Sequence, residues 1–98
     1  RQRFAGLPQA PTVAESGLAN YEADTWNAVV APAKTPDATV NRLNHEINAV
    51  LTEPDFRQKF LDLGMEARGS TPAGLRDHLR AEIAKWRVVI ESTGIEKQ

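Results

Sequence analysis

The segment 21–36, YEADTWNAVVAPAKTP, constrains the fold most, because it is the one run in this chain that favours an extended backbone. Its β-branched and aromatic side chains pack well on a pleated surface, and prolines at its end stop regular pairing. We predict one strand over residues 22–31. Residues 28–31 are consecutive apolar residues, so we expect both faces of this strand to be covered, as in a sheet flanked by helices. The residues that carry this pattern are Thr25, Trp26, Val29, Val30, Pro32 and Pro36.

Apolar residues recur at steps of three and four in three later segments, which is the period of a helix with one buried face. We predict helices over 36–52, 54–63 and 72–93. The last of these has the most regular stripe, which we expect to be buried and which consists of Leu75, Leu79, Ile83, Trp86 and Ile90.

The predicted helix boundaries carry recognisable signals. Two threonine-proline pairs, at 35–36 and 71–72, each offer a threonine N-cap followed by proline in the first turn. Gly64 and Gly94 stand where helices 54–63 and 72–93 would end. Residues 65–69 are short enough for a second strand or an extended connector.

The first twenty residues predict a loop followed by a short helix. Two prolines and a glycine without periodicity indicate a loop over 1–11. Thr12 and Glu15 have the spacing of a capping box, in which each side chain accepts from the other's backbone N–H. Gly17 suits the C-terminal residue of a helix of one to two turns.

Composition limits the classes of function. The chain has 98 residues, 41% hydrophobic and 26% charged, with a net charge of -1, which is typical of one small globular domain at most. Because positive and negative charges nearly balance, the composition does not indicate binding to nucleic acid or to a membrane surface. No cysteine is present, so disulfides and thiolate metal sites are excluded.

The chain carries no recognisable catalytic or metal-binding pattern. His45 and His78 lack a second ligand at zinc-motif spacing. Ser16, in AESGL, lacks the first glycine of a nucleophile elbow. We therefore predict no enzyme activity, no metal and no cofactor. Trp26 lies between polar neighbours, so it could form the wall of a ligand cleft or pack as an ordinary strand residue.

Several motifs follow one another in a characteristic order: PTVAESGL, TWNAVVAPAKTP, VNRLNHEINAVL, EPDFRQKFLDLGMEARGSTP and AEIAKWRVVIESTGI. Together, over residues 8–95, the chain resembles the carboxyl-terminal part of the Bug receptors. These are the extracytoplasmic solute-binding proteins of tripartite tricarboxylate transporters. Each motif alone is weak, but their joint order is specific.

The resemblance implies part of a two-lobed periplasmic binding protein of α/β class, similar to type II. Residues 1–21 would end the second lobe, and residues 22–98 would form the carboxyl-terminal part of the first lobe. It also implies a small carboxylate as solute, membrane permease subunits as partners, and a periplasmic location. The chain does not begin with Met and shows no export signal, so we interpret it as a fragment.

The same resemblance suggests where a solute would bind. Backbone N–H groups at helix N-termini can hold a carboxylate without a fixed positive side chain. We expect Thr25 and Trp26, and with less support Thr12, to lie near the ligand. The alternative is a helical interaction module that binds a protein through the stripe on 72–93. We also expect copies of the chain to associate through their exposed apolar faces.

Overall fold

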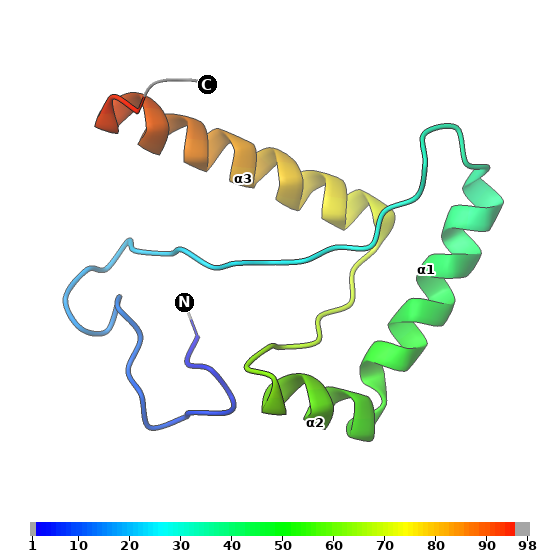
Figure 1. The fold of residues 1–98 in the computed structure, drawn as a ribbon, viewed down its shortest axis with the longest axis horizontal. Helices are drawn as coiled ribbons and strands as arrows, with labels where there is room; N and C mark the ends of the chain where they lie inside the picture. The colour runs from blue at the N-terminus through cyan, green and yellow to red at the C-terminus, as the bar shows by residue number, and fades with distance from the viewer. Residues whose placement is uncertain (1, 96–98) are drawn as a thin grey trace.

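The computed structural model describes residues 2–95 of the chain. Three α-helices occupy this range: α1 (Asp37–Thr52), α2 (Pro54–Asp62) and α3 (Pro72–Thr93). The predicted helices 36–52, 54–63 and 72–93 are thus confirmed to within one residue at each end. Within the described range α1 contacts both α2 and α3, which do not contact each other, so α1 joins the three helices (Figure 1).

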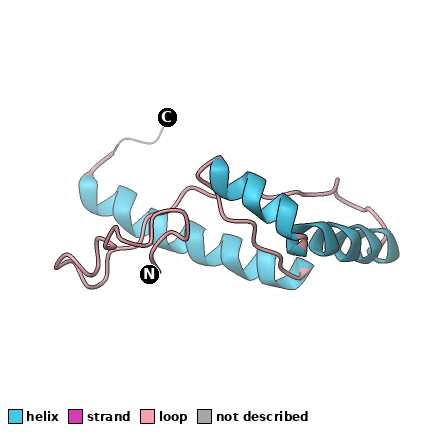
Figure 2. Cartoon of the chain, turned by 90° about the horizontal axis from the view of Figure 1, so that it is seen from below, coloured by secondary structure: helices cyan, strands magenta, loops and turns pink. Residues whose placement is uncertain are grey.

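The predicted strand over 22–31 and the predicted α/β class are wrong. Residues 2–95 contain no strand, and Figure 2 shows only helices and loops there. Residues 22–31 form no backbone ladder and are all exposed, with Val29 and Val30 at 73% and 79% exposure. Extended residues become a strand only when a neighbouring strand accepts and donates their backbone hydrogen bonds. No described segment does so, and the connector 65–69 forms no strand either.

The arrangement of the helices is open and flat. The Cα radius of gyration is 16.7 Å and the principal extents are 43 × 37 × 21 Å, whereas a compact domain of this length has a radius near ~13 Å. No described residue is fully buried.

The expected buried stripe on α3 is therefore wrong over most of its length: Leu75 alone is half-buried, while the exposed members are Leu79 (44%), Ile83 (52%), Trp86 (40%) and Ile90 (36%).

The two threonine-proline pairs behave differently. Thr71 is the N-cap of α3, and its Oγ1 accepts from the Gly74 N–H at 3.0 Å, as predicted. Thr35 is not the N-cap of α1, because that position falls on Pro36, which has no side-chain capping bond. The Thr35 hydroxyl instead donates to the Pro32 carbonyl oxygen at 2.8 Å. It closes a turn in which Lys34 has a φ of 71°.

This difference gives a matched pair of substitutions. Thr71→Ala should destabilise the chain by about 1 kcal/mol, since it removes the acceptor for an N–H in the first turn of α3. Thr35→Ala removes no capping bond and should cost less. Urea unfolding followed by circular dichroism measures both, and amide exchange at Gly74 should accelerate only in Thr71→Ala. Equal losses in the two variants would contradict the assignment of the caps.

Both predicted glycine terminators are confirmed. Gly64 and Gly94 have φ values of 75° and 67°, a left-handed conformation that glycine adopts without a Cβ penalty. After α2 the Met65 N–H donates to the Phe60 carbonyl oxygen at 2.9 Å and the Gly64 N–H donates to Leu61, also at 2.9 Å. This pair of bonds is the Schellman motif.

Residues 12–18 form one turn rather than the predicted short helix. The capping box is confirmed: the Thr12 N–H donates to Glu15 Oε2 at 2.7 Å, and the Glu15 N–H donates to Thr12 Oγ1 at 3.1 Å. The Leu18 N–H donates to the Val13 carbonyl oxygen at 3.3 Å, so a C-terminal motif begins inside the same turn. The start and stop signals overlap, which leaves no room for a helix interior.

The connector before α3 is held against α1 by two asparagines. The side-chain amides of Asn44 and Asn48 donate to the Ser70 carbonyl oxygen at 2.8 and 2.9 Å, and Asn48 Nδ2 also donates to Asn44 Oδ1 at 3.1 Å. Gly69 lies so close that a Cβ there would clash with Asn48 Oδ1. These bonds determine where α3 starts relative to α1.

Candidate functional site

Trp26 is the residue through which the extended segment meets the helices. Its ring packs edge to face against His78 of α3, with centroids 5.0 Å apart and an interplanar angle of 71°. Figure 1 shows the segment passing beside α3. The Trp26 side chain remains 40% exposed, and adjacent Thr25 is exposed. Both predicted site residues are thus accessible, and Trp26 lies beside a histidine that sequence reasoning had not included.

Thr12, the third predicted site residue, makes its hydrogen bonds within its own turn. It is half-buried in the turn 12–18, where its N–H and its hydroxyl both pair with Glu15. Within residues 2–95 no hydrogen bond or ring contact joins Thr12 to Thr25 or Trp26.

The Glu15 carboxylate already fills the anion-binding position of this turn. It accepts from Arg3 Nε at 3.0 and 3.1 Å as well as from the Thr12 N–H. The hydrogen bond from Arg3, followed by that from the Thr12 backbone, lowers the pKa of Glu15 to about 2. The carboxylate therefore stays charged at neutral pH, and the Thr12 N–H is not free for a solute.

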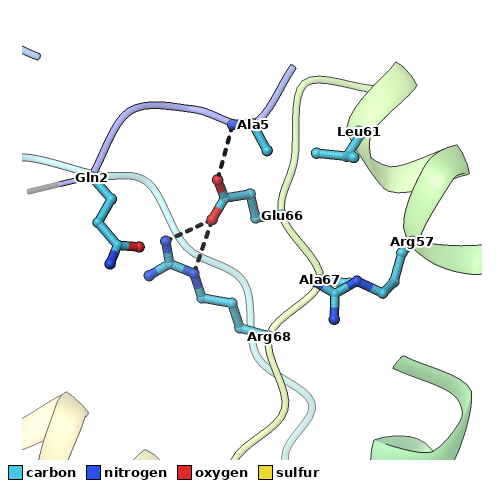
Figure 3. Close-up of a pocket in the computed structure, with 7 residues that line it drawn as sticks. All are labelled: Gln2, Ala5, Arg57, Leu61, Glu66, Ala67 and Arg68. Carbon is cyan, nitrogen blue, oxygen red and sulfur yellow. Dashed lines mark hydrogen bonds and ion pairs between the residues drawn. The ribbon is translucent and has the colours of Figure 1, made fainter. Parts of the chain in front are cut away.

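A pocket of about 300 Å³ lies between the N-terminal loop, α2 and the connector to α3 (Figure 3). Glu66 lies at its centre and accepts from the Ala5 N–H at 3.4 Å and from Arg68 Nη2 at 2.7 Å. Sequence reasoning missed this pocket. Its only local signal is the spacing of Glu66 and Arg68, since residues two apart in an extended segment lie on the same side. The lining residues are Gln2, Ala5, Arg57, Leu61, Glu66, Ala67 and Arg68.

Its charges do not suit a carboxylate ligand. The hydrogen bond with Arg68 lowers the pKa of Glu66, and the same bond raises the pKa of Arg68. Asp24 and Glu22 are close enough to raise the pKa of Arg68 further. An incoming carboxylate would have to compete with these three acidic groups for the Arg68 guanidinium. We interpret the pocket as a junction that ties the N-terminal loop to the connector.

A shallower apolar hollow of about 340 Å³ lies on the surface of α3, lined by Ile83, Trp86, Arg87, Ile90 and Glu91. Glu82 holds the Trp86 ring in place, because its Oε2 accepts from Trp86 Nε1 at 2.9 Å while its Oε1 pairs with Lys85. The bond from Lys85 is the main cause that lowers the pKa of Glu82. The hollow presents a fixed aromatic ring but no polar group arranged to orient a small solute.

No group of three or more potential ligands among residues 2–95 is placed to hold a metal ion. His45 and His78 lie on different helices, α1 and α3. None of the three helices in the described range has the length and apolarity needed to cross a membrane.

Comparison with known proteins gives one consistent family. The model of the tripartite tricarboxylate transporter family receptor matches residues 1–95. A UPF0065 protein from the tcbD-tcbE intergenic region of Pseudomonas sp. (strain P51) is 39% identical over 89 residues, covering 90% of this chain and 26% of that protein. Protein BugT of Bordetella pertussis is 33% identical over 92 residues, covering 94% of this chain and 28% of BugT.

A third relative, the UPF0065 protein of the TAR-I ttuE-ttuC' intergenic region of Agrobacterium vitis, is 32% identical over 97 residues, which cover 96% of this chain and 28% of the relative. The chain therefore spans between 26% and 28% of the length of these three proteins. No solved structure matches it.

Proposed function

Because the chain belongs to the tripartite tricarboxylate transporter receptor family, we propose that it forms part of a receptor that captures a small carboxylate in the periplasm. The receptor would deliver this solute to the membrane permease subunits of the transporter. It would catalyse no reaction and would need no cofactor. The family match over residues 1–95 carries the proposal. The resemblance of the ordered motifs over 8–95 to the Bug receptors supports it independently of the fold.

We place residues 1–21 in the second lobe of this receptor and residues 22–98 in the first. The exposure of residues 23–31 supports this division, since an extended segment with exposed valines is suited to contact further chain of the receptor. The chain also spans only 26% to 28% of its relatives. Within this arrangement, 22–31 would pass from one lobe to the other.

Thr25 and Trp26 are the residues that we assign to the solute cleft. The indole of Trp26 offers an apolar face with one polar N–H, a combination common in ligand-binding surfaces, and 40% of this side chain is accessible. Thr12 is the weaker third candidate, because its N–H and hydroxyl already pair with Glu15.

The test uses the receptor expressed from the complete reading frame that contains this sequence. Isothermal titration with citrate, succinate and acetate should give saturable binding of at least one of them. Trp26→Ala should weaken that binding by about tenfold, the effect of losing roughly 1.4 kcal/mol of contact energy. Trp86→Ala is the matched control and should leave it unchanged.

The same titrations on the 98-residue chain should give no measurable heat. A complete receptor that binds no carboxylate would contradict the proposed function. Normal affinity in Trp26→Ala would contradict the assignment of Trp26 to the cleft and leave the receptor function intact.

The exposed apolar face of α3 supports a second candidate, protein binding through that face. Its most direct form is association between copies of this chain, which the exposed stripe Leu79, Ile83, Trp86 and Ile90 favours.

A further inference from the structure

We propose that His78 is a positioning residue for Trp26: its imidazole holds the indole in the orientation that the solute meets. The role for the solute rests on the proposed function, whereas the ring contact does not depend on it. The observation behind the proposal is the edge-to-face packing of the two rings at 5.0 Å, between residues 52 positions apart in the sequence.

The extended segment lacks other means of holding the Trp26 ring. Residues 22–31 form no backbone ladder and all are exposed. Within residues 2–95 no side-chain hydrogen bond of residues 23–31 reaches a helix, and Trp26 makes the ring contact that links this stretch to α3. A side chain that is 40% exposed would sample several rotamers without such a contact.

His78 is itself on a rigid support. It lies in the second turn of α3, whose first turn is capped by Thr71 and whose start is held to α1 through Ser70. One helical turn further on, Glu82 is fixed by Lys85 and Trp86. His78 and Glu82 are four positions apart in α3, which places them on the same face of the helix.

This geometry explains why a ring is required at position 78. An edge-to-face pair depends on the quadrupoles of two flat rings, so phenylalanine can replace the imidazole in this role and alanine cannot. Hydrogen bonding by the imidazole is not needed for the contact. We therefore expect the Trp26 ring to be held equally well in the parent chain and in His78→Phe, and less well in His78→Ala.

The experiment follows the fluorescence of Trp26 alone, in the 98-residue chain carrying Trp86→Phe. His78→Ala should increase the acrylamide quenching constant about twofold, because the indole would go from 40% exposed to nearly free. His78→Phe should keep the quenching constant of the parent. His45→Ala, which changes the other histidine on α1, is the control and should have no effect. Circular dichroism of each variant checks that the helices remain.

Unchanged quenching in His78→Ala, or equal quenching in His78→Phe and His78→Ala, would overturn the proposal. Solute titration of the complete receptor separates it from the proposed function. Weaker binding in His78→Ala that His78→Phe restores supports the positioning role at the site. A receptor that binds solute normally while its Trp26 quenching rises would overturn the role for the solute, and the ring contact would stand.

Discussion

Replacing Ile83 with glutamate should raise the dissociation constant for self-association of this chain by about a hundredfold. Burying one isoleucine side chain contributes about 1.5–3 kcal/mol, and each 1.4 kcal/mol corresponds to a factor of ten. A carboxylate at this position would also lose hydration in any apolar contact. Ile83 is 52% exposed in the middle of the α3 stripe, so its loss should affect the centre of an association surface.

The geometry of α3 makes this face the expected contact between copies. Trp86 and Ile90 continue the stripe beside Ile83 and line a common hollow with it, together with Arg87 and Glu91. Within residues 2–95 no other helix covers it, since α3 contacts only α1. A contiguous apolar surface of this kind is typical of a protein-binding site.

Sedimentation velocity over a range of protein concentrations measures the effect. Val88→Glu is the matched control, because Val88 lies on the same helix, is 65% exposed and lies off the stripe. It should associate like the parent chain. A parent chain that stays monomeric at high concentration, or a Val88→Glu variant as weakened as Ile83→Glu, would show that the stripe is not an association surface.

The double substitution of Asn44 and Asn48 by alanine should destabilise the chain by about 2 kcal/mol. It removes both amide donors from the Ser70 carbonyl oxygen, and each protein hydrogen bond contributes about 0.5–1.5 kcal/mol net. Domains of this size have only a few kcal/mol in reserve. We expect the connector to leave α1 and the start of α3 to lose its fixed position, while each helix retains its own hydrogen bonds.

Asn41→Ala provides the control, as Asn41 is an exposed residue of the same helix. Urea unfolding gives the free-energy change, and distances between spin labels on α1 and α3 report the relative position of the helices. A narrow, unchanged distance distribution in the double variant would contradict the role of the two asparagines. Equal stability losses in Asn41→Ala and the double variant would do the same.

The helices could be predicted from sequence because their signals are local. The apolar period, the Thr71 cap and the two terminal glycines each act within one or two turns, and the structure places α1, α2 and α3 within one residue of the expected bounds. The limit of local signals is visible at Thr35. Its threonine-proline pair is identical to that of Thr71, yet the preceding turn with Lys34 at positive φ uses its hydroxyl.

The strand and the site depend on groups that are distant in the sequence. Residues 22–31 have β-propensity, but propensity supplies no partner strand, and none is present in the described range. Thr25 and Trp26 could be selected as candidates from their residue types. The contact of Trp26 with His78 could not be predicted, since the sequence around one residue carries no signal for the other. The same holds for Glu66 and the Ala5 N–H, 61 residues away.

The turn 12–18 has a consequence for folding during synthesis. The hydrogen bonds between its own residues join positions at most five apart, so closing it costs little loop entropy and needs microseconds or less. Ribosomes add only about 5–20 residues per second. The turn should therefore be formed in the nascent chain well before Thr71 and the rest of α3 have been translated, and the later contacts should assemble on a piece that is already ordered.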